Sequence, residues 1–215
     1  YEQADKLFAN NGPLTKYYTD EINNAGINLV NLDVWEVGFR EFSNSVKPIN
    51  TADDIAGIRL RVLDSKVHQG FWKALGADPV PMSWGEAYTA LQQKAIDGVE
   101  NAISVLDGNN INEVNSYLAL TDHNYSAIFI IMSAQSMQKL TPEQQKIVLD
   151  AAKEAGTYQR EEQRRQADAA ISNLTSKGMT LTRPDKASIE TKVASFLEEQ
   201  KARYPEIVKI IESTK

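Results

Sequence analysis

The side chains best suited to chemistry in this sequence are those that could bind an organic anion. Arg61 lies in a short alternating segment, 58–63, and its planar guanidinium can hold a carboxylate through two parallel hydrogen bonds. Trp84 offers an apolar surface for a sugar ring or a carbon chain, and Asn101 supplies both a donor and an acceptor. One anchoring charge with a few polar groups is what recognition of a small ligand requires.

Each of these side chains also has an ordinary structural role. An arginine on a short strand commonly forms a structural salt bridge, and a tryptophan commonly packs in the core. Asn101 is uninformative by itself, and Asp64 can cap the helix that follows it. Considered individually, each of these residues is compatible with a role in ligand binding and with a structural role.

No signature of a common enzyme class is present. The sequence lacks the GxxxxGK[ST] phosphate loop, the GxGxxG fingerprint, the GxSxG elbow and the HExxH zinc pair. His68 and His123 have no partner at helical ligand spacing, so we expect both to be structural.

A cluster of charged residues on a predicted long helix is interpreted as a solvated face. Its members are Glu161, Glu162, Arg164 and Arg165. Glu161 and Arg165 are four residues apart, which predicts an ordinary surface ion pair.

Composition restricts the class of protein. Of 215 residues, 42% are hydrophobic and 24% are charged, which is typical of a globular protein and not of a disordered one. A net charge of −6 without a basic tract disfavours nucleic-acid binding. The absence of cysteine excludes disulfides, thiolate metal sites and cysteine nucleophiles, whereas a carboxylate metal site stays open. The longest apolar run, 127–132, is too short to cross a bilayer.

The elements that position the candidate residues alternate between helix and strand. Apolar spacing predicts a helix over 14–24, which Gly26 stops, and a strand over 27–34. The alternating segment 58–63 predicts a second strand, and a helix follows between Ser65 and Gly76.

The middle of the chain continues this pattern. Ser83 and Glu86 form a predicted capping box at the start of another helix, and a short strand is expected over 96–101. Two further strands are expected near 117–121 and 126–133. The second is nearly all apolar, which predicts a strand buried on both faces.

The last part of the chain is mainly helical. A capping box predicts one helix over 141–177, about 55 Å long and able to cross between two lobes, with Gly156 as a candidate bend. Gly178 precedes a short strand, and residues 186–213 are predicted to be helical with a break near Pro205.

Motifs along the chain resemble the solute-binding proteins of tripartite ATP-independent periplasmic (TRAP) transporters, which bind C4-dicarboxylates, sialic acid or uronates. The matching segments are Gly38-Phe39-Arg40, Lys47-Pro48-Ile49, 54–62, 74–82, 86–92 and 96–101. Their order and spacing are specific. The similarity continues through Thr121-Asp122-His123 and the long helix, and so covers nearly the whole chain.

The resemblance gives a binding role to each of the candidate residues. Arg61 matches the arginine that forms the family's salt bridge to the ligand carboxylate, and Arg40 matches one that assists it. Asn101 matches an asparagine that contacts the ligand, and Trp84 matches an aromatic residue that lines the pocket. Asp64 falls at a variable pocket position that tunes ligand choice.

The resemblance also implies a fold: α/β, two-lobed, like a type II periplasmic binding protein, with a long helix crossing both lobes. Residues 1–38 would form part of lobe I, and 39–125 would form lobe II. Residues 126–165 would return to lobe I and begin the crossing helix, and 166–215 would complete it and add C-terminal helices on lobe II. The family's N-terminal block of lobe I has no counterpart before Tyr1, so we expect the chain to be part of a longer protein.

These implications predict a periplasmic protein, with its signal peptide removed, that binds an organic acid and delivers it to TRAP membrane permease subunits. We expect no catalysis, cofactor, bound metal, nucleic acid or membrane insertion. Asp64 and Trp84 favour a hydroxylated ring such as a uronate, because a carboxylate accepts hydroxyl hydrogen bonds and repels a second carboxylate. The alternatives are a C4-dicarboxylate ligand, a sensory domain, and a lyase that uses Glu86 or Glu100 as a base.

Overall fold

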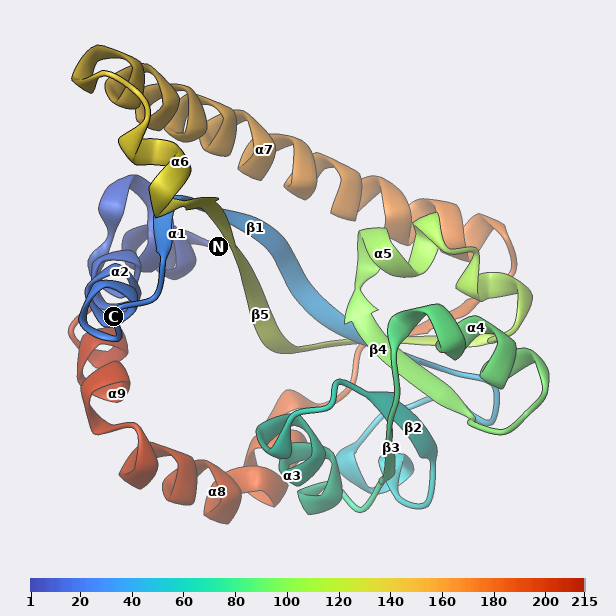
Figure 1. Ribbon diagram of the computed structural model, residues 1–215. Coiled ribbons are helices and arrows are strands. Elements are labelled where there is room, and N and C mark those ends of the chain that lie inside the picture. The colour runs from blue at the N-terminus through green and yellow to red at the C-terminus, as the bar shows by residue number, and fades with distance from the viewer. Residues whose placement is uncertain (215) are drawn as a thin grey trace. The chain divides into compact units, whose positions relative to one another are not determined.

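The computed structural model describes residues 1–214, which divide into two compact units (Figure 1). Unit 1 contains Tyr1–Gly38, Tyr125–Arg165 and the residues from Tyr204 onward, and unit 2 contains Phe39–Asn124 and Gln166–Arg203. The assignment of residues 166–215 to the rest of the crossing helix and to C-terminal helices on lobe II stays a prediction. Lys215, the last residue of that expected segment, lies outside the described residues.

The strands hydrogen-bond in the order β3-β2-β4-β1-β5-β6. Their bounds are β1 Leu29–Asn44, β2 Arg59–Val62, β3 Asp78–Pro81, β4 Gly98–Ala102, β5 Tyr117–Ser133 and β6 Thr180–Thr182. Strand β2 is parallel to both β3 and β4, β1 is antiparallel to β4, and β5 is parallel to β6. Helices connect most of these strands, which confirms the predicted α/β class.

Helices account for most of the remaining chain. Those of unit 1 are α1 Glu2–Phe8, α2 Pro13–Asn24, α6 Ala134–Gln138 and α9 Pro205–Glu212. Those of unit 2 are α3 Lys66–Ala74, α4 Trp84–Gln92, α5 Ile103–Gly108 and α8 Lys186–Arg203. Short 3-10 turns cover Ala9–Asn11, Ala52–Ile55 and Ile111–Glu113. Helix α7, Pro142–Ser176, contributes residues to both units. No described helix is both long and apolar enough to span a membrane.

Two hydrophobic clusters pack on opposite faces of the unit 2 strands. Leu60 and Val62 of β2 belong to the first cluster, together with residues of α3 and α8. Val99 of β4 belongs to the second cluster, with residues of α4, α5 and α7. Since successive side chains of a strand point to opposite faces, Arg61 points away from the first cluster. Its register partner on β4 is Val99, which agrees with that direction.

A correction concerns the charged cluster on the long helix, which is not uniformly solvated. Arg164 is half-buried within unit 1, where it donates to Glu36 (2.7 Å from Nη2 to Oε2) and to Asp5 (2.7 Å from Nη2 to Oδ1). These two carboxylates raise the pKa of Arg164. Arg165 forms its ion pair with Glu162, not with the predicted Glu161. Helical spacing alone could not identify carboxylates distant in sequence.

A second correction concerns strand β5, because the prediction that residues 126–133 are buried on both faces is wrong. Ile128 is 47% exposed and Ile131 is 50% exposed. An apolar run shows that a strand can be buried, but it does not provide the second layer that would cover it. The two expected strands are also one continuous element, in which Asp122 has a φ of 45°.

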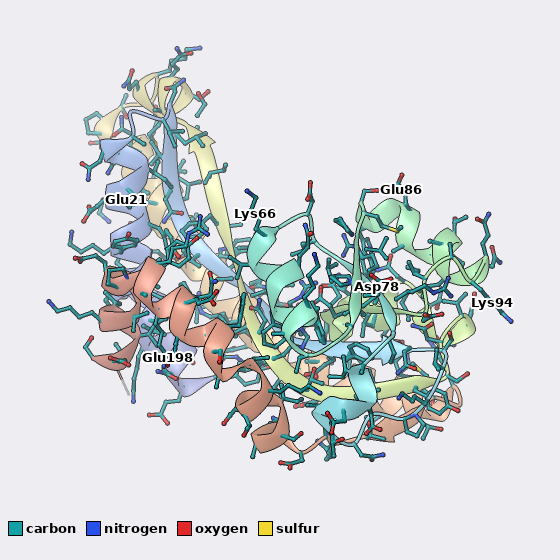
Figure 2. All side chains as sticks on the ribbon, turned by 90° about the horizontal axis from the view of Figure 1, so that it is seen from below. Glu21, Lys66, Asp78, Glu86, Lys94 and Glu198 are labelled. Carbon is teal, nitrogen blue, oxygen red and sulfur yellow. The ribbon has the colours of Figure 1, made fainter. Side chains whose placement is uncertain are left out.

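The ends of the helices follow the predicted local signals. Ser83 and Glu86 form the capping box of α4, and Figure 2 labels Glu86 at that end of the helix. Thr141 and Gln144 bond reciprocally at the start of α7: Thr141 N donates to Gln144 Oε1 (2.9 Å), and Gln144 N donates to Thr141 Oγ1 (3.3 Å). Gly178 ends the same helix with a φ of 98°.

Gly156 has a packing role in unit 1. It lies inside the continuous helix α7. A Cβ added there would overlap Asp33 Oδ2 and would lie 3.0 Å from Trp35 Nε1, both on β1. Helix α7 can therefore approach β1 this closely only because residue 156 lacks a side chain.

We expect Gly156→Ala to lower the free energy of unfolding by about 2 kcal/mol, because overpacking of a buried contact costs roughly 1–3 kcal/mol. Gly85→Ala is the matched control, since Gly85 lies in α4 with open space around its Cβ position. Helix propensity predicts that this control is neutral or stabilising by up to about 1 kcal/mol. Urea denaturation measures both, and equal stability of the two variants would contradict the packing role.

Candidate functional site

The residues that the sequence singled out all lie in unit 2, near the carboxyl ends of its parallel strands. Arg61 is the penultimate residue of β2, and Asp64 follows that strand. Trp84 begins α4 after β3, and Asn101 lies near the end of β4. Parallel strands bring their carboxyl ends to one edge of a sheet, where α/β proteins commonly bind ligands.

Arg61 is buried and incompletely paired. Arg61 is only 2% exposed. Its Nε and Nη2 atoms both donate to the carbonyl oxygen of Met82, at 2.9 and 2.7 Å. Its Nη1 is buried without a hydrogen-bond partner, and Arg61 forms no salt bridge among the residues that the structure describes. Burial lowers the pKa of Arg61, and the nearby charge of Glu100 opposes this shift. The guanidinium thus retains both a positive charge and a free donor.

Trp84 lies close to this guanidinium. The Cζ atom of Arg61 is 5.3 Å from the centroid of the Trp84 ring, a distance at which a cation and an aromatic face attract each other. Trp84 Nε1 donates to Asn109 Oδ1 (3.2 Å), which fixes one edge of the indole. The structure therefore brings Arg61 and Trp84 together.

Asn101 and Asp64 are less constrained. Asn101 Oδ1 accepts from the backbone N–H of Ala102 (2.9 Å), and its register partner on β1 is Glu41. Burial and the neighbouring Asp122 raise the pKa of Glu41 to about 9, so Glu41 carries its proton at neutral pH. Asp64 is exposed, and its Oδ1 accepts only a long hydrogen bond from Gln69 Nε2 (3.5 Å).

Arg40 does not offer a free guanidinium. Its Nε donates to Glu100 Oε2 (2.5 Å), and its Nη2 donates to Glu100 Oε1 and to the Glu100 carbonyl oxygen, both at 2.9 Å. Arg40 is buried, and the Glu100 side chain is completely buried. The charge of Arg40 is therefore already neutralised by Glu100. The expectation that Arg40 assists in binding the ligand stays a prediction.

His123 and His68 extend this buried ion pair. His123 Nε2 lies 3.1 Å from Glu100 Oε2, and Thr121 Oγ1 lies 2.8 Å from His123 Nδ1. A proton on Nε2 lets the imidazole donate to Glu100 Oε2. His68 Nδ1 lies 3.9 Å from Glu100 Oε1, and burial lowers the pKa of His68. Both histidines thus line the carboxylate that holds Arg40.

The charge state of Glu100 follows from these contacts. Burial alone would raise the pKa of Glu100, but the hydrogen bonds from His123 and Arg40 outweigh burial and lower this pKa to about 2. Glu100 is therefore a stable anion and a weak base. The sequence suggested only a possible catalytic base at Glu100 and no partner for the histidines. Arg40 of β1, His123 of β5 and His68 of α3 meet Glu100 only in the folded chain, and no local motif encodes these contacts.

The two sets of charged side chains occupy different faces of the strands. Glu100 is the register partner of Phe42, a member of the first cluster. Arg61 has Val99 as its register partner, a member of the second cluster. The face that carries Arg61 and Trp84 can accept an anion, whereas the charges of Arg40 and Glu100 compensate each other.

Comparisons with known proteins bear on the family and the fold of the chain. The sequence profile of bacterial extracellular solute-binding protein, family 7, matches residues 1–203. The 2,3-diketo-L-gulonate-binding periplasmic protein YiaO of Escherichia coli is 36% identical over 129 residues, 60% of this chain and 39% of that protein. The sialic acid-binding periplasmic protein SiaP of Vibrio cholerae is 34% identical over 154 residues, 72% of this chain and 48% of that protein. The chain spans about half the length of the curated relatives it matches.

Solved structures are similar over most of the chain. A TRAP periplasmic solute-binding protein from Polaromonas sp. JS666, bound to D-erythronate, matches with a TM-score of 0.91 and 31% identity, over 100% of this chain and 69% of that one. The sugar acid-binding protein DctPAm from Advenella mimigardefordensis, in complex with galactonate, matches with a TM-score of 0.88 and 30% identity, over 99% and 68%. A homologue from Sulfitobacter sp. NAS-14.1 with bound β-D-galacturonate matches with a TM-score of 0.86 and 28% identity, over 94% and 66%.

We expect Glu100→Gln to lower the free energy of unfolding at pH 7 by about 3 kcal/mol, because Arg40 would remain buried without a counter-charge. The folded pKa of Glu100 lies below its ordinary value of 4.5, so the carboxylate stabilises the protein above about pH 4.5, and this contribution is lost as the pH falls towards 2. Urea denaturation at pH 7 and pH 3.5 should show the difference between wild type and variant shrinking. A difference that is independent of pH would contradict the assignment, and Glu21→Gln on the exposed face of α2 is the control.

Proposed function

The chain belongs to family 7 of the bacterial extracellular solute-binding proteins, and from that premise we propose that it binds an organic acid in the periplasm and delivers it to a TRAP-type membrane transporter. The proposed ligand is a sugar acid, such as a uronate. Units 1 and 2 would correspond to the two lobes of the binding protein. Ligand binding would shift the population towards a closed form that the permease subunits accept.

The observation that carries the proposal is the unpaired donor of Arg61. A buried polar group without a partner costs roughly 1–3 kcal/mol, and more when it is charged. Arg61 Nη1 is such a group, and the adjoining Nη2 donates to a peptide carbonyl rather than to a carboxylate. A ligand carboxylate would supply the missing acceptor and the missing negative charge together.

The surroundings of Arg61 favour a sugar acid. Trp84 supplies the ring face on which a pyranose can lie, and Asn101 supplies an amide close to the same edge of the sheet. The exposed carboxylate of Asp64 can accept hydroxyl hydrogen bonds. Similar proteins are described with bound galacturonate, galactonate or D-erythronate, all of which are hydroxylated acids.

Catalysis is disfavoured by the state of the two carboxylates that could act as bases. Glu86 is engaged in the capping box of α4, where hydrogen bonds from Ser83 lower its pKa. Glu100 has a pKa near 2 and is held by Arg40 and His123. A sensory domain is the second candidate, because it would bind the same ligand at Arg61. Permease genes beside the gene for this protein would favour transport.

We expect Arg61→Ala in the full-length protein to weaken uronate binding by roughly 100-fold, since loss of one partner of a buried ion pair costs about 2–5 kcal/mol. The matched control is Arg59→Ala on the same strand. Arg59 donates to Asp97 (2.6 Å) and to the carbonyls of Lys94 and Ala95, so it already has structural partners. Isothermal titration calorimetry measures both affinities. If a folded Arg61→Ala variant binds the uronate as tightly as the wild type, Arg61 does not anchor the ligand carboxylate.

A separate substitution tests the ligand class. We expect Asp64→Asn to weaken glucuronate binding by roughly fivefold, because an amide is a weaker acceptor than a carboxylate. The same change should strengthen binding of succinate, since it removes a repelling negative charge. Titration of the two ligands into wild type and variant separates the possibilities. If succinate binds the wild-type protein more tightly than glucuronate, the ligand is a dicarboxylate and the sugar-acid assignment is wrong.

A further inference from the structure

Glu41 of β1 is a buried carboxyl group on the face of the sheet that carries Arg61. Its register partner on β4 is Asn101, and Asn101 shares a face with Val99, the register partner of Arg61. Glu41 is only 4% exposed. It forms no ion pair with any residue that the structure describes. A buried carboxylate without a counter-charge is unfavourable, so burial favours the neutral acid at Glu41.

Asp122 of β5 is the residue that Glu41 contacts. The backbone N–H of Asp122 donates to Glu41 Oε2 (3.1 Å). The Asp122 carboxylate in turn pairs with Lys186 at the start of α8, and its side chain is 39% exposed. Because Asp122 has both a cation and solvent, and Glu41 has neither, a proton shared by the two acids belongs on Glu41. Glu41 and Asp122 are called the acid pair below.

The pKa shifts of the two groups agree with this assignment. Burial and the hydrogen bond with Asp122 raise the pKa of Glu41 to about 9. Burial would also raise the pKa of Asp122, but the bonds from Glu41 and Lys186 outweigh burial and lower it. The charge of His123 on the same strand acts on Asp122 in the same direction. Arg40, which precedes Glu41, is neutralised by Glu100.

The acid pair lies where β5 departs from an extended backbone. Asp122 has a φ of 45°, in the left-handed region, which residues other than glycine keep only when their surroundings favour it. Its N–H is the one that Glu41 accepts, so Glu41 supports this conformation. Unit 2 ends two residues later, at Asn124, and β5 continues into unit 1. The acid pair thus controls the backbone directly before the chain leaves unit 2.

We propose that the acid pair is a proton-dependent switch of the β5 backbone, in which Glu41 accepts the N–H of Asp122 and donates its own O–H to the Asp122 carboxylate. When Glu41 loses its proton, this donor disappears and two carboxylates repel each other. The left-handed conformation of Asp122 is then no longer supported. Glu41 is a positioning residue, since it acts through Asp122 and β5.

A consequence for binding rests on the proposed function. If units 1 and 2 close on a uronate, a change of backbone in β5 next to the unit boundary alters the equilibrium between the open and closed forms. Ionisation of Glu41 should therefore weaken uronate binding above about pH 9.

Carbon-13 NMR of the uniformly labelled full chain tests the switch without any ligand. We expect the side-chain carboxyl resonance of Glu41 to titrate near pH 9 and to be absent in Glu41→Gln. The ¹³Cα resonance of Asp122, which reports its backbone conformation, should follow the same midpoint in the wild type. It should stay in place in Glu41→Gln, because the amide retains an acceptor and a donor but cannot ionise.

Stability gives a second readout. The folded pKa of Glu41 lies above its ordinary value of 4.5, so its contribution to stability is complete below pH 4.5 and is lost as the pH rises towards 9. Between these limits, the folding equilibrium constant of the wild type should fall about tenfold per pH unit relative to Glu41→Gln. Urea denaturation at pH 6 and pH 8 measures this change. Glu190→Gln on the exposed face of α8 is the matched control and should behave like the wild type.

Three results would each overturn the switch. These are a Glu41 resonance that titrates below pH 6, an Asp122 ¹³Cα resonance that does not follow Glu41, and parallel pH dependence of stability in the wild type and Glu41→Gln. If Glu41→Gln fails to fold, the first two observations on the wild type decide.

Isothermal titration calorimetry of the full-length protein at pH 7 and pH 9.5 tests the consequence for binding. The wild type should lose more affinity for glucuronate than Glu41→Gln does. Equal losses would show that the acid pair does not act on binding. If neither protein binds a sugar acid at either pH, the proposed function is wrong, and the NMR titration still decides the switch.

Discussion

Burying a guanidinium costs several kcal/mol unless a partner of opposite charge accompanies it. Unit 2 buries Arg40 and Arg61 within one sheet, and of the two only Arg40 has such a partner among the residues that the structure describes. Glu100 neutralises Arg40 through bonds at 2.5 and 2.9 Å, and His123 supports the same carboxylate. Arg61 donates to the Met82 carbonyl and forms no salt bridge with any residue that the structure describes. This difference in charge compensation is the physical basis for proposing Arg61, and not Arg40, as the anchor of a ligand carboxylate.

The strand geometry keeps these two arrangements apart. Alternation along β2 and β4 sends Arg61 towards the second hydrophobic cluster and Glu100 towards the first. One face therefore presents an uncompensated positive charge beside an indole ring. The other face carries the closed Arg40–Glu100 ion pair and an aromatic pocket lined by Phe71, Trp72 and His123. The two faces belong to one sheet, and the charges of Glu100 and Arg40 still act on Arg61 across it: Glu100 raises the pKa of Arg61, and Arg40 lowers it.

Local signals predicted the ends of the elements well. The capping boxes at Ser83 and Thr141 and the glycine stops at Gly26 and Gly178 depend on contacts within a few residues, which a sequence displays directly. Burial of β5 was predicted wrongly, because burial depends on which other segment covers a strand. The pairing of Arg164 was also missed, since Asp5 and Glu36 are distant in sequence.

The sequence by itself determined the α/β class, the family resemblance and the identity of the residues at the carboxyl ends of the strands. It did so because caps, periodicity and motif spacing are local properties of the chain. Tertiary structure decided which arginine remains unpaired, which histidines surround Glu100 and which side chains enclose the aromatic pocket. Those outcomes depend on the pairing of β1 with β4 and on the packing of α3 against α8. Both contacts join segments that are distant in sequence, so no local sequence pattern predicts them.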